Sequence, residues 1–204
     1  MALSKEDILQ EALSLLNESG LEGVTLRKLA SRLGVQAPAL YWHFKNKAVL
    51  VNEIAEAILQ KEFAEIKPRG EGESWKEWLI ALLNRLRKAM LAYTDGGRVV
   101  AGAHLSLTMA DLSEAAIKTL CEAGVSLRES RLIVLTAVHY TFGRVIEEQS
   151  PPPKEGLERF DAERFKQDHP YMMAGIEEYF GSGRTVDDLF NDGLRLIVDL
   201  RNAD

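Results

Sequence analysis

The stretch TLRKLASRLGVQAPALYWHF, from Thr25 to Phe44, decides the fold of the amino-terminal region. Thr25 can cap one helix, Gly34 can form a sharp turn, and a second, short helix can begin near Pro38. A helix, a glycine-containing turn and a short helix form the helix-turn-helix pattern. The apolar side chains spaced to face inward are Leu29, Leu33, Val35, Leu40 and Phe44.

The same spacing leaves the neighbouring rings without a place in the core. Tyr41 and His43 are expected to point away from it, with Trp42 at its edge. Tyrosine and histidine can donate hydrogen bonds to phosphate oxygens while their rings pack on sugars. Lys47, at the start of a further helix that Asn46 can cap, adds a phosphate contact where the helix dipole also favours anions.

The start of the short helix, QAPA, carries the residues that would meet base edges. Gln36 can read adenine through two hydrogen bonds, whereas Ala37 and Ala39 can only meet thymine methyls or allow close backbone approach. Arg27, at the start of the preceding helix, is the candidate for a guanine contact. The alternative is that these three helices form a structural or protein-binding module.

The distribution of charge supports a nucleic-acid partner although the total does not. The chain has 204 residues and a net charge of −6, yet no acid occurs between Gly23 and Asn52. That segment holds five basic residues, Arg27, Lys28, Arg32, Lys45 and Lys47. A basic end on an acidic body can attract phosphates, although an accidental gap in the charge pattern would look the same.

Helical periodicity extends over almost the whole chain, so we predict an all-α fold. The amino-terminal helix is expected at residues 5–19, with Gly20 stopping it, and residues 98–106 are expected to be irregular or weakly helical. Residues 150–156 (SPPPKEG) are expected to begin a mobile loop. Further helices are expected from Asn46 to about 63 and at 74–93, 108–123, 127–149, 168–180 and 185–202. We predict a helix-turn-helix domain at 1–47, a connecting helix at 46–63, and a ligand-binding and dimerisation domain at 64–204.

Several classes of protein are disfavoured. With 46% apolar residues the chain can bury a core, but no apolar run is long enough to cross a membrane, and no export signal is evident. We therefore expect a cytoplasmic protein without a membrane partner. Cys121 stands alone and is expected to be a small buried residue. No nucleophile elbow, phosphate loop or metal-binding motif appears, so we expect no enzyme, no cofactor and no bound metal.

The segment GLEGVTLRKLASRLGVQAPALYWHFKNKAVLVNEIA resembles the DNA-binding domain of the tetracycline-repressor (TetR) family, and LYWHFKNK is its most specific part. The segments EGESWKEW, DGGRV, CEAGVSL and AVHYTFGRVIEEQ look like the core domain of the repressor for which the family is named. The resemblance covers most of the chain except roughly residues 150–165.

This resemblance implies a homodimeric repressor that binds a palindromic DNA operator, with two recognition helices about 34 Å apart. The positions that contact DNA in the family hold matching residues at Arg27, Pro38, Tyr41, Trp42, His43 and Lys47. Three further contact positions hold Leu26, Ala37 and Ala39 in place of polar residues. We therefore expect a different operator, read more through apolar contacts and DNA shape.

The resemblance also places an effector site in the larger domain. The positions that hold the tetracycline–magnesium complex in the family's namesake carry apolar residues here, namely Phe63, Leu82, Leu86, Val100 and Ala103. Only Glu147 matches an acid near the metal. Because the hydrogen-bonding groups are lost, we predict no useful affinity for tetracycline with magnesium.

What remains is a predicted apolar cavity for a small apolar or aromatic effector. Its predicted lining is Phe63, Leu82, Leu86, Val100, Ala103, Leu105, Val138 and Phe142, with His104, His139 and Glu147 as candidate polar anchors. Alternatively these side chains pack together and leave no cavity, with His139 a core histidine.

The helices at 127–149 and 185–202 are expected to form a four-helix dimer interface with their two-fold mates. The candidate interface residues are Leu132, Leu135, Phe190, Leu194, Ile197 and Val198. Two other functions stay open: a repressor that responds to tetracycline-class antibiotics, and a dimeric ligand sensor with weakened DNA binding.

Overall fold

The computed structural model describes residues 4–150 and 161–199, and its regular elements there are all helices, which confirms the predicted all-α class. The chain divides into two compact units, residues 1–149 and 150–204. No helix among the described residues is long and apolar enough to cross a membrane.

The first helix, α1 (Lys5–Gly23), begins at a capping box. The Ser4 hydroxyl accepts from the Asp7 amide at 3.0 Å, and the Ser4 amide donates back to the Asp7 carboxylate at 3.2 Å. Gly20 interrupts the helix with φ 64° and ψ −178°, as expected, but a further helical turn follows and reaches Gly23. The side chains that α1 buries are Ile8, Ala12, Leu13, Leu15 and Leu16.

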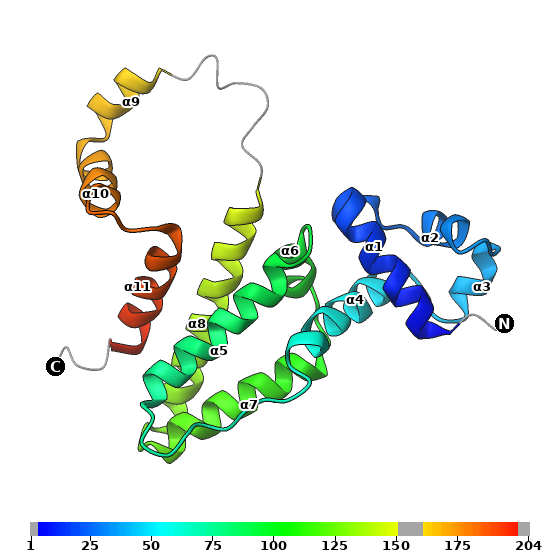
Figure 1. The fold of residues 1–204 in the computed structure, drawn as a ribbon, viewed down its shortest axis with the longest axis horizontal. Helices are drawn as coiled ribbons and strands as arrows, with labels where there is room; N and C mark the ends of the chain where they lie inside the picture. Colours follow the sequence, from blue (N-terminus) through cyan, green and yellow to red (C-terminus); the bar gives the residue numbers. More distant parts are fainter. Residues whose placement is uncertain (1–3, 151–160, 200–204) are drawn as a thin grey trace. The chain divides into compact units, whose positions relative to one another are not determined.

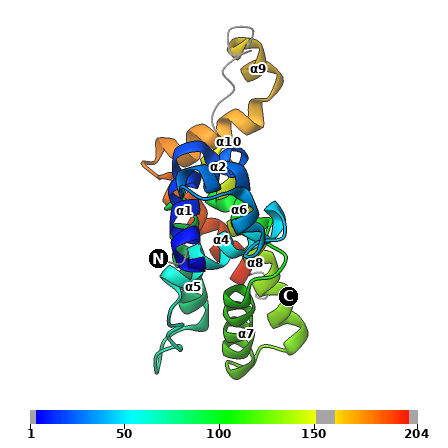
Figure 2. The ribbon, with the colours of Figure 1, turned by 90° about the vertical axis from the view of Figure 1, so that its right-hand side faces the viewer.

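The helix-turn-helix prediction is confirmed in its elements. Helix α2 (Leu26–Arg32) is capped by the Thr25 hydroxyl, Gly34 makes the turn with φ 66°, and α3 (Ala37–Tyr41) has a proline in its first turn. Helices α1 to α3 lie together (Figures 1 and 2), and α2 packs on both of the others. The apolar spacing therefore produced a small domain core from residues close in sequence.

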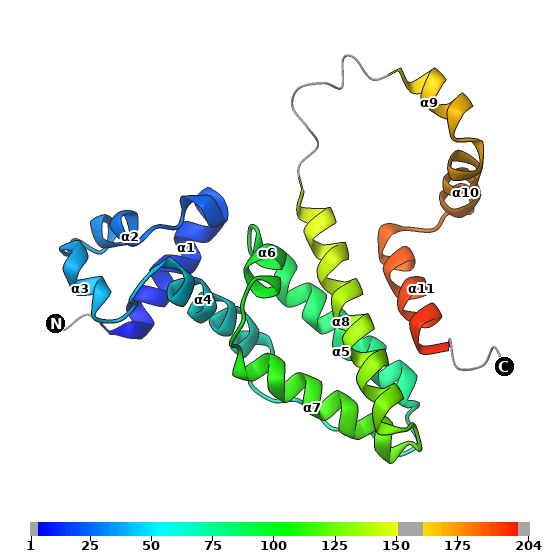
Figure 3. The same cartoon turned by 180° about the vertical axis from the view of Figure 1, so that it is seen from behind.

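Helix α4 (Lys47–Glu62) leads from this region into the larger part of the unit and is capped by the Asn46 side chain, as predicted. The remaining helices of the unit are α5 (Trp75–Leu91), α6 (Gly96–Ala101), α7 (Leu107–Glu122) and α8 (Leu127–Gln149). Helices α7 and α8 pack on each other and converge at the turn that joins them (Figure 3), and α8 also packs on α5 and α6. Residues 98–106 were expected to be irregular or weakly helical; α6 covers them up to Ala101, and residues 102–106 form a turn and a bend without regular structure.

The second unit contains α9 (Ala162–Asp168), α10 (Pro170–Gly181) and α11 (Val186–Asp199). The short helix α9 was not predicted, whereas the Thr185 cap of α11 was, and its hydroxyl accepts from the Asp188 amide at 3.2 Å. On α11 the residues Phe190, Leu194 and Val198, four apart, are buried. The predicted loop beyond residue 150 lies outside the described residues.

Candidate DNA-binding surface and effector site

The aromatic residues after α3 divide sharply between core and solvent. Leu40 and Phe44 are fully buried, as predicted. Tyr41 is 50% exposed and His43 is also exposed, whereas Trp42, placed at the edge by the sequence pattern, is 91% exposed. Since an exposed indole loses hydrophobic stabilisation, this surface is better explained by contact with a partner than by the fold.

The candidate base-reading side chains are also accessible. Gln36 and Pro38 at the start of α3 and Arg27 in the first turn of α2 are exposed, while Ala37 and Ala39 are half-buried. Gln36 stands at the N-cap position of α3 without a capping hydrogen bond from its side chain. Its amide therefore remains available for a base edge.

Leu26 differs from its neighbour Arg27. It occupies a position where the resemblance implies a DNA contact, and its side chain is only 6% exposed. A leucine at this position contributes to the small core of the first three helices. Leu26 therefore serves packing within the first three helices and is not available to DNA.

Lys47 is tethered within the protein. Its ammonium donates to the carbonyl oxygen of Leu21 at 3.0 Å, and its side chain is half-buried. An ammonium group has three N–H donors, so two remain for a phosphate oxygen. The bond fixes the direction in which this lysine points.

Arg32, in contrast, is taken up by intramolecular ion pairs. Its guanidinium contacts the carboxylates of both Glu11 and Glu18 on α1. The hydrogen bond with Glu18 is the main reason why the pKa of Arg32 is raised and that of Glu18 lowered. Arg32 thus joins α1 to α2, and the basic residues left for DNA are fewer than the sequence suggests.

The larger part of the unit holds a small apolar cavity of about 10 Å³, which has room for about one water molecule. Three residues of the predicted effector site line it: Leu82 and Leu86 of α5 and Val138 of α8. The other lining residues are Leu79, Leu83, Met109, Leu112, Ser113, Ala116 and Val134. The packed alternative therefore describes this state of the chain better than an open cavity.

The rest of the predicted effector set is dispersed. Phe63 and Val100 are buried outside this lining, and Ala103 and Phe142 are half-buried. Leu105 is 80% exposed, and His104 is exposed beside it, because the chain leaves α6 at Ala101 and runs outward before α7.

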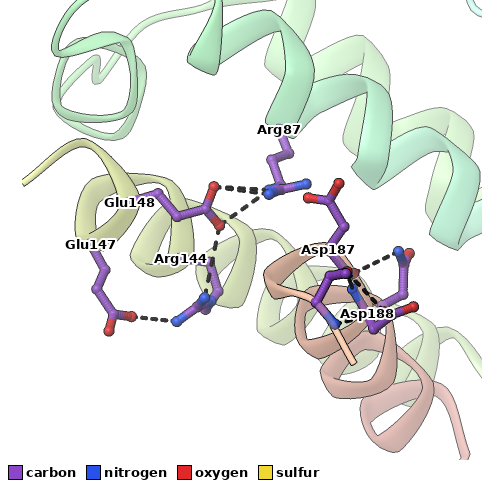
Figure 4. Close-up of polar contacts among 8 residues, drawn as sticks. Arg87, Arg144, Glu147, Glu148, Asp187 and Asp188 are labelled. Atoms are coloured by element: carbon purple, nitrogen blue, oxygen red, sulfur yellow. Dashed lines mark hydrogen bonds and ion pairs between the residues drawn. The ribbon is translucent and has the colours of Figure 1, made fainter. Parts of the chain in front are cut away.

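The outer face of α8 carries two more of the predicted residues. His139 is exposed, so its expected place as a core histidine was wrong for this chain. Glu147 is 70% exposed and accepts from Arg144 at 2.6 Å. Figure 4 shows this pair beside the partly buried Glu148, which accepts from Arg87 of α5 at 2.9 Å. The Arg87–Glu148 pair joins α5 to α8, whereas the Arg144–Glu147 pair lies within α8 and gives Glu147 a partner other than a metal.

Two residues, Glu56 and Arg85, hold α4 against the neighbouring helices and were not predicted from the sequence. Glu56 accepts hydrogen bonds from the Ser106 hydroxyl at 2.6 Å and the Thr108 hydroxyl at 2.7 Å, and so holds the start of α7. Burial of the carboxylate raises its pKa, but the hydrogen bonds from Ser106 and Thr108 outweigh burial and bring the pKa below its ordinary value of 4.5.

Arg85 fastens the other end of α4. It donates to the Glu62 carbonyl at 2.6 Å and to its carboxylate at 3.0 Å, and its guanidinium lies 4.7 Å from the centre of the Phe63 ring. A lone acid or arginine in an amphipathic helix gives no sign of such a partner. Only the pairing of α4 with α5 and α7 brings these groups together.

Two segments of the chain, together covering most of it, match known family profiles. The sequence profile described as "Bacterial regulatory proteins, tetR family" matches residues 8–54, and that described as "Tetracyclin repressor-like, C-terminal domain" matches residues 67–199. The tetracycline repressor protein class A from transposon 1721 of Escherichia coli is 39% identical over 197 residues, covering 97% of this chain and 89% of that protein.

Two solved structures are informative. A TetR variant from Acinetobacter baumannii AYE in complex with minocycline is 32% identical, with a TM-score of 0.73, and the match covers 98% of this chain and 97% of that one. BioQ bound to its natural double-stranded DNA operator is 31% identical, with a TM-score of 0.65, over 72% of this chain and 88% of that one.

Proposed function

Because the chain belongs to the TetR family of bacterial transcription regulators, we propose that it represses genes by binding a palindromic operator as a homodimer. We further propose that a small apolar or aromatic effector, other than the tetracycline–magnesium complex, releases it. Its relatives are regulators and not enzymes, and the proposal assigns no catalytic step to this chain.

The proposal that the chain binds DNA rests on the outward set of rings at the end of α3. Tyr41, Trp42 and His43 present two polar tips and a large exposed indole directly beside the buried Phe44. Such groups contact sugar and phosphate along a groove, while Gln36 and Arg27 are placed to meet base edges. The related BioQ binds double-stranded operator DNA, which supports the same role here.

The homodimer is supported by exposed leucines on the longest helix. Leu132 and Leu135 of α8 are 52% and 41% exposed, and Leu127 near its start is also exposed. The predicted partners on α11 are different, because Phe190, Leu194 and Val198 are already buried in one chain. A two-fold interface that covers the α8 leucines would place two copies of α3 for half-sites one DNA turn apart.

The proposal of an apolar or aromatic effector rests on the chemistry of the side chains. Phe63, Leu82, Leu86, Val100 and Ala103 have no side-chain donor or acceptor for a polar drug or its metal. Since the apolar cavity between α5, α7 and α8 is nearly closed, an effector would bind a state in which it is open. It can shift the protein only by its difference in affinity between the open and closed states, with α4 as the connection to the DNA-binding helices.

The operator test is selection of DNA duplexes from a random pool by the full chain, followed by mobility shift of the recovered sequence. The proposal predicts two inverted half-sites whose centres lie about 10 base pairs apart. The variant Trp42→Ala should bind the recovered duplex more weakly while keeping the wild-type thermal midpoint. Recovery of no preferred sequence would contradict the proposed function.

The effector test is titration calorimetry with tetracycline, with magnesium chloride and with a chelator in parallel. We expect no magnesium-dependent binding in the submicromolar range. Such binding would instead assign the chain to the tetracycline-responsive repressors, as the names of its relatives suggest. A preferred operator with no effect of any ligand on binding would favour regulation without an effector.

A further inference from the structure

Helix α1 is interrupted at Gly20, and residues from another part of the chain take over the backbone hydrogen bonding that is lost there. In a continuous helix the amide of Leu21 would donate to the carbonyl of Asn17, four residues earlier. The backbone of Gly20, with φ 64° and ψ −178°, turns the Leu21 amide away from that carbonyl. Both groups then need other partners, because an unpaired backbone group is unfavourable inside a protein.

The turn between α5 and α6 supplies both partners. The Leu21 amide donates to the Asp95 carboxylate at 2.8 Å, and the Asn17 carbonyl accepts from the Thr94 hydroxyl at 3.0 Å. The Thr94 amide also donates to the Asn17 side chain at 3.0 Å. Two side chains, more than 70 residues along the chain, thus replace the single backbone hydrogen bond that Gly20 breaks.

Asp95 has an unusual backbone conformation, and its carboxylate contacts both the Leu21 amide and, at 3.6 Å, the Arg98 guanidinium. Asp95 is the one non-glycine residue with positive φ among the described residues, at 57°, and it stands at the N-cap of α6. An aspartate there commonly caps its own helix, yet this carboxylate makes no such bond and reaches Leu21 instead. A Cβ at Gly20 would lie 2.7 Å from the same carboxylate oxygen, so both the backbone conformation and the contact require glycine.

Leu21 connects the contact between α1 and the α5–α6 turn to the candidate DNA-binding surface. Its carbonyl accepts from the Val24 amide at 3.3 Å and from the Lys47 ammonium at 3.0 Å, which occupies both lone pairs. One residue therefore has its amide held by Asp95 and holds Lys47 with its carbonyl. The path from the α5–α6 turn to a candidate phosphate contact consists of two hydrogen bonds.

We propose that Asp95 is a positioning residue for DNA binding: by fixing Leu21 after the break at Gly20, it orients Lys47 toward the phosphate backbone. A lysine loses much rotamer freedom when it is ordered, so a lysine already held in place loses less when DNA binds. This inference rests on the proposed DNA-binding function and adds to it a residue of the larger domain.

The test uses the full chain and the duplex that the wild-type protein selects from a random pool, with affinity measured by fluorescence anisotropy over a salt series. Asp95→Gly removes the carboxylate and tolerates the positive φ, and Lys47→Met removes the ammonium but keeps the stem. Asp95→Gly should weaken binding about three- to tenfold, with little further loss when Lys47→Met is also present. Its salt slope should fall by about one per protomer, to the slope of Lys47→Met.

Matched variants separate the positioning of Lys47 from a general loosening of the contact between α1 and the α5–α6 turn. Thr94→Val removes the hydroxyl bond to Asn17 but leaves the Asp95–Leu21 bond, so its salt slope should equal that of the wild type. Asp95→Asn keeps a weaker, neutral acceptor and should lie between wild type and Asp95→Gly. If Asp95→Gly does not fold, the cycle is run with Asp95→Asn, and a smaller coupling to Lys47→Met is expected.

Independent, multiplying effects of the Asp95 and Lys47 substitutions, or an unchanged salt slope in the Asp95 variant, would overturn the inference. Asp95 would then hold the fold without directing Lys47. If the wild-type chain selects no duplex, the proposed function fails first, before any variant is compared, and the inference fails with it.

Discussion

The surface around α3 and the apolar core between α5, α7 and α8 are opposite kinds of site. Around α3, Trp42 is 91% exposed next to the fully buried Phe44, so the site consists of groups that the fold leaves unused. In the core, Leu82 and Leu86 are buried and the space between the helices holds about one water. The candidate DNA-binding surface is exposed in the isolated chain, whereas the proposed effector site would have to open before a ligand could enter.

The largest effect that would sharpen this contrast comes from replacing two aromatic residues that directly follow α3. Phe44→Ala should destabilise the protein by about 3–5 kcal/mol, because it removes a fully buried ring from the small core of the first three helices. Trp42→Ala should change stability by no more than about 0.5 kcal/mol. Urea denaturation followed by circular dichroism measures both, and equal losses would show that Trp42 packs within the fold.

Replacing a cavity-lining residue tests whether the core is as closed as the structure indicates. Leu86→Ala should reduce the free energy of unfolding by about 2–5 kcal/mol, since the surrounding helices cannot fully collapse onto the space. Indole or benzene should recover part of that loss by filling the space. A loss below about 1 kcal/mol would mean that the core rearranges easily and that the wild-type cavity is already adaptable.

The sequence was sufficient to predict the elements and the outward side chains of the first candidate site, because the residues that build it are close together. Twenty residues contain both helices, the turn and the buried stripe, so the outward direction of Tyr41 and His43 follows from helical spacing alone. The exposure of Trp42 was underestimated because α3 ends at Tyr41, and the spacing rule does not hold beyond the helix end.

The second site could not be predicted in the same way. A cavity is the space left among side chains of several helices, and spacing within one helix does not determine it. His104 and Leu105 were assigned to the site by position along the chain, but the segment after α6 runs outward. The tethers made by Glu56, Arg85 and Asp95 join residues about 20 to 75 positions apart, beyond the range of any local pattern.

Two basic residues on the candidate DNA-binding surface should affect DNA binding in different ways. Arg27→Ala should weaken operator binding by about 1–3 kcal/mol and relax the base preference at one position of each half-site. Lys47→Ala should weaken binding to all sequences alike and flatten the dependence on salt. Anisotropy titrations with the selected operator and a scrambled duplex distinguish the two, and identical behaviour would contradict the assigned roles.

The smallest expected effect concerns the tether between α4 and α7, which lies between the two sites. The pKa of Glu56 is lowered in the folded chain, so its stabilising contribution is present above pH 4.5 and is lost as the pH falls through the lower, folded pKa. Glu56→Gln should cost about 1 kcal/mol at neutral pH, less at acidic pH, and so flatten the acidic part of the stability profile. The exposed Glu65→Gln serves as the control, and a matching profile for both variants would show that the tether contributes nothing.

The outward orientation of the rings at and just after the end of α3 can be tested most directly by ¹⁹F NMR of the full chain labelled with 5-fluorotryptophan, with Trp42→Phe identifying the Trp42 signal. On addition of the selected duplex, the Trp42 resonance should move while those of Trp75 and Trp78, on α5, stay in place. A Trp42 resonance that stays fixed while the duplex binds, or that moves with protein concentration alone, would contradict the account.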